Sequence, residues 1–597
     1  MTGVVISPWS ISTTVREPSR LPDFLRVLKD MSGEEWNKAA QVEYQIRLLQ
    51  ARLYGVGSKQ FYQGLPKRDI KLLESGDDIP FDDAQRIFTS KNYKDAPMRG
   101  RVSFKPLEKL GFAALTDKRA IFAGKRVQIT ESGKALLAEK DDYADIFMRV
   151  LLKWEIPNVL DARGFPPEDG YNIKPFVGFL RLIDAVNDLC RKDGMKAKGL
   201  SFLEVMGFGI TLIDYRKINK TARDIVELRR RAAKILHTKR DDFCWREIAR
   251  LRPGYQLKNA HDYADNALRY FRLTKYVRIS EWGKYVNLEP MRQNELSSLF
   301  DRDDARPAFQ MKQEYAAFLA SAKQPDLPGE TKPELTKTVS FLAAHSPASV
   351  KPKQADIKQM DTAALKKLRN SLRVSIARAA GEKEKAALRN PVEVENCIKE
   401  LETLPRSGSN LSIKLEWLAA RGLGILNDAE EIRPNYSLGD DGLPSGHALA
   451  GKADIECYYG AFASICEVTL HRDSKQWIHE AQPVMRHLRE FKAKNGGKPA
   501  YCLFIAPCLH QDTINMFHLC AKGGYENEKQ LLAPMTVKQF SGILRFAANR
   551  AQLKTPLNRN NIKTLLDRLA VSVETMKTSE KWRKDADLII EQWKQSQ

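Results

Sequence analysis

The chain has 597 residues and a formal charge of +22, with 97 Lys and Arg residues against 75 Asp and Glu. This length exceeds what one hydrophobic core usually serves, so we expect three or four folded units. The basic excess indicates a polyanionic partner, and it favours nucleic acid over an acidic membrane surface. Because no apolar run approaches ~20 residues, we expect no membrane-spanning segment.

The cysteines and the N-terminus indicate a reducing, cytoplasmic environment. Eight cysteines are scattered without a Cys-x-x-Cys pair, which argues against a structural zinc site. Cys457, Cys466 and Cys502 lie in apolar strand patterns, and we interpret them as reduced core residues. The first 16 residues lack the basic start and long apolar core of a signal peptide.

The first unit, residues 1–142, is predicted to be mostly helical and to end in a helix, a β-hairpin and a further helix. A helix stops at Gly111, a strand covers residues 127–129, and Thr130 begins a capped helix. This order is typical of a winged-helix DNA-binding domain. The candidate phosphate contacts are Arg99, Arg101, Lys105, Lys125 and Arg126. The alternative is a basic face that only water contacts.

The second unit, residues 143–290, is predicted to repeat the arrangement of helices followed by a β-hairpin. Apolar periodicity predicts helices over residues 146–153, 175–187, 224–239 and 264–271. Two alternating strands follow around Gly283, at residues 276–279 and 285–288. The pattern indicates a second winged-helix-like recognition module.

A linker region, residues 291–385, separates these units from the last one, residues 386–597. Between residues 321 and 360, prolines alternate with lysines and small polar residues. Proline cannot continue a helix, so we expect extended connections there with short helices at most. Helical pattern with dense charge returns from residue 361 to residue 402, and we interpret it as a spacer.

The most informative stretch is residues 453–469. Apolar and polar residues alternate on both sides of Gly460, which predicts two short strands joined by a tight turn. Asp454 lies near the start of the first strand and Glu467 near the end of the second, and in an antiparallel hairpin these ends meet. Converging carboxylates are ligands that Mg²⁺ prefers, and beside a phosphate such a site can hydrolyse a phosphodiester. We therefore expect a Mg²⁺-dependent nuclease.

Flanking elements extend the hairpin to the order helix, strand, strand, helix, strand, helix. This is the order of the PD-(D/E)xK nuclease core. Glu416 lies on the upstream helix, whereas Glu480 and His487 are seven residues apart on the downstream helix and share a face. Thr469 occupies the usual lysine position and can supply neither a cation nor a base, so Glu480 or His487 must assist. The alternative makes these acids ordinary surface residues.

Four segments, taken in order, carry a family resemblance. They are Leu415-Glu416-Trp417-Leu418, the run from Gly451 to Thr469, Pro483-Val484-Met485-Arg486-His487, and the apolar run from Tyr501 to Pro507. Together they resemble the AlwI family of type IIS restriction endonucleases, which includes the BstNBI-type site-specific nicking enzymes. The likeness is strong from about residue 411 to 517 and patchy before it.

The resemblance implies a DNA-recognition half, a linker and a cleavage domain that cuts at a fixed distance outside the recognised sequence. It assigns catalytic roles to Glu416, Asp454, Glu467, Glu480 and His487. Its metal ligands are Asp454, Glu467, the Val468 carbonyl and Glu480. Duplex DNA is the implied substrate, in the cytoplasm of a prokaryote, together with a cognate methyltransferase. Second-strand cleavage would require a transient homodimer or a small partner subunit.

The expected fold class is multidomain α+β, with a mostly helical winged-helix-like N-terminal half, a helical linker and a C-terminal α/β PD-(D/E)xK domain. The recognised bases, the cut offset and the number of strands cut stay open. Two other functions also stay open. The missing motif lysine favours a non-catalytic DNA-binding regulator with a degenerate nuclease-like domain. A repair or transposon-associated nuclease would recognise DNA structure instead of sequence.

Overall fold

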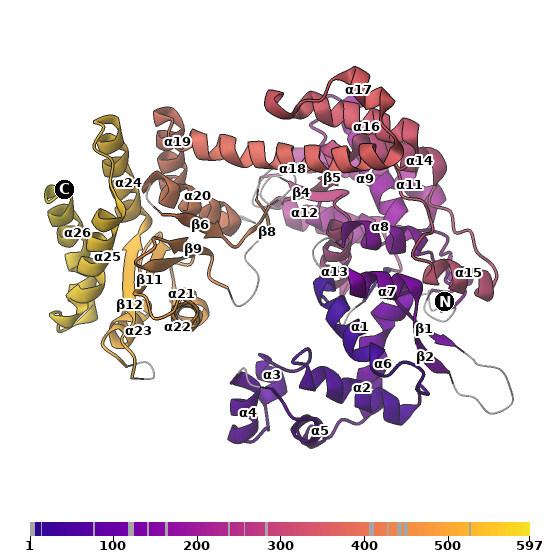
Figure 1. The fold of residues 1–597 in the computed structure, drawn as a ribbon, viewed down its shortest axis with the longest axis horizontal. Coiled ribbons are helices and arrows are strands. Elements are labelled where there is room, and N and C mark those ends of the chain that lie inside the picture. The colour runs from indigo at the N-terminus through magenta and orange to yellow at the C-terminus, as the bar shows by residue number, and fades with distance from the viewer. Residues whose placement is uncertain are drawn as a thin grey trace. The chain divides into compact units, whose positions relative to one another are not determined.

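The computed structural model describes residues 1–597 except 1–5, 13–14, 76–77, 117–124, 140–142, 161–164, 237–238, 256, 281–283, 405–410, 427–428, 439–443, 447–451 and 525–526 (Figure 1). The chain divides into two compact units. The first comprises Met1–Arg278, Val286–Ala343 and Pro352–Arg369, and the second comprises Ile279–Tyr285, Ala344–Lys351 and Asn370–Gln597. The fold is mixed α+β, with its largest sheet in the second unit.

The first unit opens with helices around a small hairpin. Strands β1 (Ala113–Thr116) and β2 (Arg126–Ile129) pair antiparallel. The predicted cap is confirmed, because the Thr130 hydroxyl accepts the Gly133 N–H at 3.0 Å and so starts the next helix. The helices of this part are α1 (Leu21–Lys29), α2 (Lys38–Gln50), α3 (Lys59–Tyr62), α4 (Lys67–Glu74), α5 (Phe81–Ser90), α6 (Ala96–Lys109) and α7 (Glu131–Ala138).

A second helical part with a small sheet follows. Strands β3 (Leu200–Ser201), β5 (Tyr285–Leu288) and β4 (Val277–Ser280) are neighbours in that order. The predicted strands are therefore found to within a residue, although the predicted turn at Gly283 lies outside the described residues. The winged-helix assignment of both parts stays a prediction. The helices here are α8 (Ala144–Lys153), α9 (Pro175–Lys192), α10 (Phe202–Glu204), α11 (Ile218–Ala233), α12 (Arg240–Leu251), α13 (Ala260–Leu273) and α14 (Gln293–Arg302).

The proline-rich segment corrects one prediction. We expected short helices at most, but α16 (Lys332–His345) has 14 residues. Pro333 stands in its first turn, where a backbone N–H has no partner within the helix, so the proline can begin this helix instead of breaking it. Leu335, Val339 and Leu342 are buried and stabilise it. The neighbouring helices are α15 (Lys312–Ala320), α17 (Gln354–Gln359) and α18 (Thr362–Ala387).

The second unit contains a five-stranded mixed sheet in the order β12-β11-β10-β9-β6. Strand β9 pairs antiparallel with both β6 and β10, whereas β11 pairs parallel with both β10 and β12. The strands are β6 (Glu431–Pro434), β9 (Ile455–Tyr458), β10 (Ala463–Val468), β11 (Ala500–Ala506) and β12 (Leu531–Thr536), and a separate small pair is β7 (Ser437–Leu438) with β8 (Pro444–Gly446).

Helices cover both faces of this sheet because both faces are apolar. Along β11, Leu503 and Ile505 belong to one buried cluster, whereas Cys502 and Phe504 belong to another. Helices α24 (Val537–Gln552), α25 (Arg559–Val571) and α26 (Ser579–Gln595) lie together on the first face, with α19 (Pro391–Glu402) and α20 (Leu411–Leu426) in the same cluster (Figure 1). On the second face lie α22 (Gln482–Lys494) and α23 (Gln511–Ala521).

Both edge strands of the sheet contain a proline. Pro434 ends β6, and Pro534 lies inside β12, where it faces Phe504 of β11. Proline lacks a backbone N–H, so it is tolerated at a sheet edge but not in a central strand.

The cysteines and the helices agree with two expectations from the sequence. All eight cysteines are free, and Cys457, Cys466 and Cys502 are buried in the sheet, as predicted. Within the described part of the chain, every helix is too short or too polar to cross a membrane.

Candidate active site

The hairpin brings two carboxylates together as predicted. Gly460 forms the turn with a φ of 80°, a conformation that glycine adopts without strain. Ile455 pairs with Cys466, so Asp454, just before β9, lies beside the end of β10. The Val468 N–H donates to Asp454 Oδ2 at 2.9 Å and fixes the carboxylate there.

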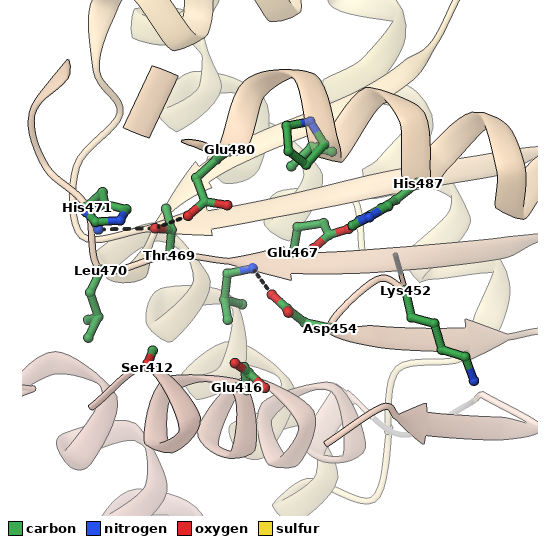
Figure 2. A pocket seen from close by; sticks show the side chains of 13 residues that line it. Ser412, Glu416, Lys452, Asp454, Glu467, Thr469, Leu470, His471, Glu480 and His487 are labelled. Carbon is green, nitrogen blue, oxygen red and sulfur yellow. Dashed lines mark hydrogen bonds and ion pairs between the residues drawn. The ribbon is translucent and has the colours of Figure 1, made fainter. Parts of the chain in front are cut away.

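Helix α20, which packs against the sheet, adds a third acid, Glu416. Leu415 and Leu418 pack into the apolar cluster beneath the sheet and thereby fix the rotation of the helix. Glu416, between them, is only 5% exposed and turns toward the hairpin carboxylates (Figure 2).

The helical segment after β10 supplies Glu480. This segment consists of α21 (Ser474–Gln476), a π-helical turn η8 (Trp477–Ala481) and α22. The Thr469 hydroxyl, at the motif's lysine position, donates to Glu480 Oε1 at 3.0 Å. Glu480 therefore faces the end of β10.

His487 of α22 lies against Glu467. Its Nδ1 is 2.8 Å from Glu467 Oε1, and the side chains are 11% and 8% exposed. Burial and the nearby Arg486 lower the pKa of His487, whereas burial raises the pKa of Glu467 to about 8. Both shifts favour the neutral forms of the two side chains.

These residues share one cavity of about 380 Å³ (Figure 2). Its lining is Ser412, Glu416, Lys452, Asp454, Glu467, Val468, Thr469, Leu470, His471, Glu480, Pro483, Val484 and His487. All five predicted catalytic residues and all four predicted metal ligands are therefore brought together.

Burial of the acids has the largest effect on their pKa values, and repulsion between them adds to it. Burial raises the pKa of Asp454 well above its usual range, and the charges of Glu467 and Glu416 raise it further. The charges of Glu480 and Glu416 likewise raise the pKa of Glu467. A hydrogen bond between Glu467 and the backbone of Asp454 lowers this pKa and partly offsets the increase. A cation among these side chains would relieve the repulsion.

The donor set fits a hard divalent cation, which prefers oxygen ligands. Among the described residues, no group of three or more His, Cys, Asp or Glu side chains is already arranged to hold a metal ion. Each of the three acids makes a contact of its own: Asp454 accepts from Val468, Glu467 contacts His487, and Glu480 accepts from Thr469.

The sequence interpretation missed three polar residues that line the cavity. Ser412 precedes Glu416 by four residues on α20, so helical periodicity could have placed it on the same face. His471 follows Thr469 by two residues, which is the strand repeat. Lys452 gave no sequence signal, and its amine extends away from the acids (Figure 2).

The predicted DNA contacts lie in the first unit, and several have partners there. Arg101 forms an ion pair with Asp95 at 2.9 Å, and Lys105 forms one with Glu108 at 2.7 Å. Arg126 donates to the Gly33 carbonyl at 2.7 Å. The other two are exposed: Arg99, which lies over the Tyr93 ring, and Lys125.

Comparison with known proteins defines the class. The family model described as AlwI restriction endonuclease matches residues 108–543, well over half of the chain, and membership of this family implies a nuclease. The chain belongs to the AlwI restriction endonuclease family.

One solved structure is also similar in sequence. The small subunit of the heterodimeric restriction endonuclease R.BspD6I is 26% identical, over 32% of this chain and 95% of that subunit, with a TM-score of 0.27. No curated protein gives a significant match.

The raised pKa of Glu467 predicts how stability depends on pH. In metal-free protein, folded Glu467 keeps its proton up to a pH of about 8, but the unfolded chain loses it near the ordinary value of 4.5. Unfolding in this window releases a proton, so this residue's contribution to the free energy of unfolding falls as pH rises.

Glu467→Gln should therefore raise the Tm of metal-free protein relative to wild type, by on the order of 5 °C at pH 8 and little at pH 4.5. Differential scanning calorimetry across this range measures the difference. Glu456→Gln is the matched control, because Glu456 lies on β9 outside the cavity. An equal Tm difference at both pH values would contradict the prediction.

Proposed function

We propose that this protein is a Mg²⁺-dependent type IIS site-specific endonuclease, cutting or nicking duplex DNA at a fixed distance from a short asymmetric sequence. The observation that carries the proposal is the convergence of Glu416, Asp454, Glu467 and Glu480 in one cavity at the open end of a hairpin. Burial raises the pKa values of Asp454 and Glu467, and buried acids of this kind destabilise a fold, so their presence argues for a metal-assisted reaction.

The metal would be held by Asp454, Glu467, the Val468 carbonyl and Glu480. Bound there, Mg²⁺ supplies charge neutralisation at the scissile phosphate and lowers the pKa of a water ligand. Glu416 completes the acid cluster from α20. Glu480 orients the attacking water through its second carboxylate oxygen, and His487 holds Glu467 in place and can take up or return a proton at Nδ1.

The regulator with a degenerate nuclease-like domain is the less supported alternative. The argument for this alternative was that Thr469 stands where the motif usually has a lysine. Thr469 is hydrogen-bonded to Glu480 inside the cavity, so the position still has a partner in the acid cluster. A single catalytic centre can cut one strand at a time, so double-strand cleavage would require a second copy, a partner subunit or sequential action.

The purified protein should break supercoiled plasmid only when Mg²⁺ is present. Run-off sequencing of both strands should locate the breaks at one offset from one short asymmetric sequence. One broken strand identifies a nicking enzyme, and two identify a restriction enzyme. Metal-dependent breaks at DNA branches or ends, without a shared sequence, would instead support a structure-specific nuclease.

Asp454→Asn should lower the cleavage rate by about 10³-fold, because metal-ion catalysis contributes several kcal/mol. Specific DNA binding should persist, since the predicted recognition residues belong to the first unit. Single-turnover cleavage and gel-shift assays measure the two properties, with Glu456→Gln as the control from the adjoining strand. Loss of binding together with cleavage would show that Asp454 serves the fold instead of the reaction.

Two exposed basic residues of the first unit, Arg99 and Lys125, test the predicted recognition surface. Arg99→Ala and Lys125→Ala should each weaken DNA binding and reduce the slope of log K against log salt by about 0.9, the loss of one phosphate contact. Lys134→Ala is the control, because Lys134 is also exposed but is paired with Glu131. Unchanged slopes in both variants would remove these residues from the DNA contact surface.

A further inference from the structure

Thr469 is held from two sides. It is 4% exposed, and its hydroxyl accepts the His471 N–H at 3.2 Å while donating to Glu480 Oε1 at 3.0 Å. Because the hydroxyl has one proton, accepting from the backbone leaves that proton directed at the carboxylate. The contact is therefore oriented by the chain itself.

Gln476 fixes the start of the helical segment that carries Glu480. Its side chain is fully buried, and its amide nitrogen donates to the carbonyls of His471 at 2.8 Å and Cys508 at 2.9 Å. Its amide oxygen accepts the His510 N–H at 2.8 Å. Gln476 thereby joins the loops that follow β10 and β11 to the start of the helix that carries Glu480.

Between Gln476 and Glu480 lies the π-helical turn η8. A π-helical turn is rare because it holds one residue more than an α-helical turn, and it is found often at functional sites. Here Trp477 and Ile478 are 42% and 58% exposed, whereas Glu480 faces the sheet. Hydrogen bonds at both ends, through Gln476 and Thr469, hold the turn in this register.

We infer that Thr469 is a positioning residue that fixes the carboxylate of Glu480 over the cavity, within a frame held by Gln476. One oxygen of Glu480 is engaged by the Thr469 hydroxyl, and the other points toward the side of Glu467 (Figure 2). A lysine would orient reactants through its charge, whereas Thr469 orients an acid through a hydrogen bond. The inference rests on the proposed nuclease activity.

The test compares Thr469→Val, which keeps the side-chain shape but removes the hydroxyl, with Thr469→Ser, which keeps the hydroxyl. Thr469→Val should lower kcat by about 10- to 100-fold, the range for a hydrogen bond to a charged group. KM for DNA should stay unchanged, since Thr469 is buried. Thr469→Ser should restore most of kcat.

Two readouts do not depend on cleavage. Isothermal titration of the DNA-free protein with Mn²⁺ alone should show affinity lowered by about tenfold in Thr469→Val but not in Thr469→Ser. A crystal structure of Thr469→Val should show Glu480 turned away from the end of β10.

The Gln476→Glu variant tests the frame itself. It keeps the acceptor for the His510 N–H but loses both donated hydrogen bonds. Its loss of kcat should not add to that of Thr469→Val, because both residues act through Glu480.

The outcomes separate the two proposals. Wild-type protein that makes no metal-dependent breaks would overturn the nuclease, whatever the variants do. Cleaving wild-type protein with an unchanged kcat and Mn²⁺ affinity in Thr469→Val would overturn only the positioning role. A higher kcat in Thr469→Lys would overturn it too, because the position would then serve as a vacant lysine site.

Discussion

The candidate active site of the second unit depends on one hydrogen bond, from the Val468 N–H to Asp454. It joins the start of β9 to the end of β10. The bond also commits the fold to burying a carboxylate beside Glu467, which costs free energy unless other interactions compensate. The apolar helices on both faces of the sheet supply that compensation and keep the acids in place.

Much of this unit could be predicted from the sequence, because its signals are local. Alternation around Gly460 indicated the hairpin, and the antiparallel pairing of strand ends was enough to place Asp454 near Glu467. The π-helical turn could not be predicted in this way, since the buried Gln476 next to η8 contacts the distant loop that follows β11. The prediction of short helices around Pro333 was wrong for a related reason. The effect of a proline depends on its position within a helix, and the composition of a segment does not show that position.

The DNA contacts of the first unit were harder to predict from the sequence. Its charged side chains can bind either a phosphate or a nearby acid, and Arg101 and Lys105 have acids of their own within reach. Spacing along the chain does not tell which partner a long, flexible side chain selects. A phosphate that competes with such an ion pair must first separate it, so exposed residues such as Arg99 and Lys125 are the more available contacts.

The prolines at the sheet margins limit how two such units could associate. Joining sheets edge to edge needs a continuous row of backbone donors, and Pro434 and Pro534 each remove one. The open margins of this sheet are thus protected against strand exchange and against amyloid-like stacking. Two such units would therefore associate through helices or loops instead of through paired strand edges.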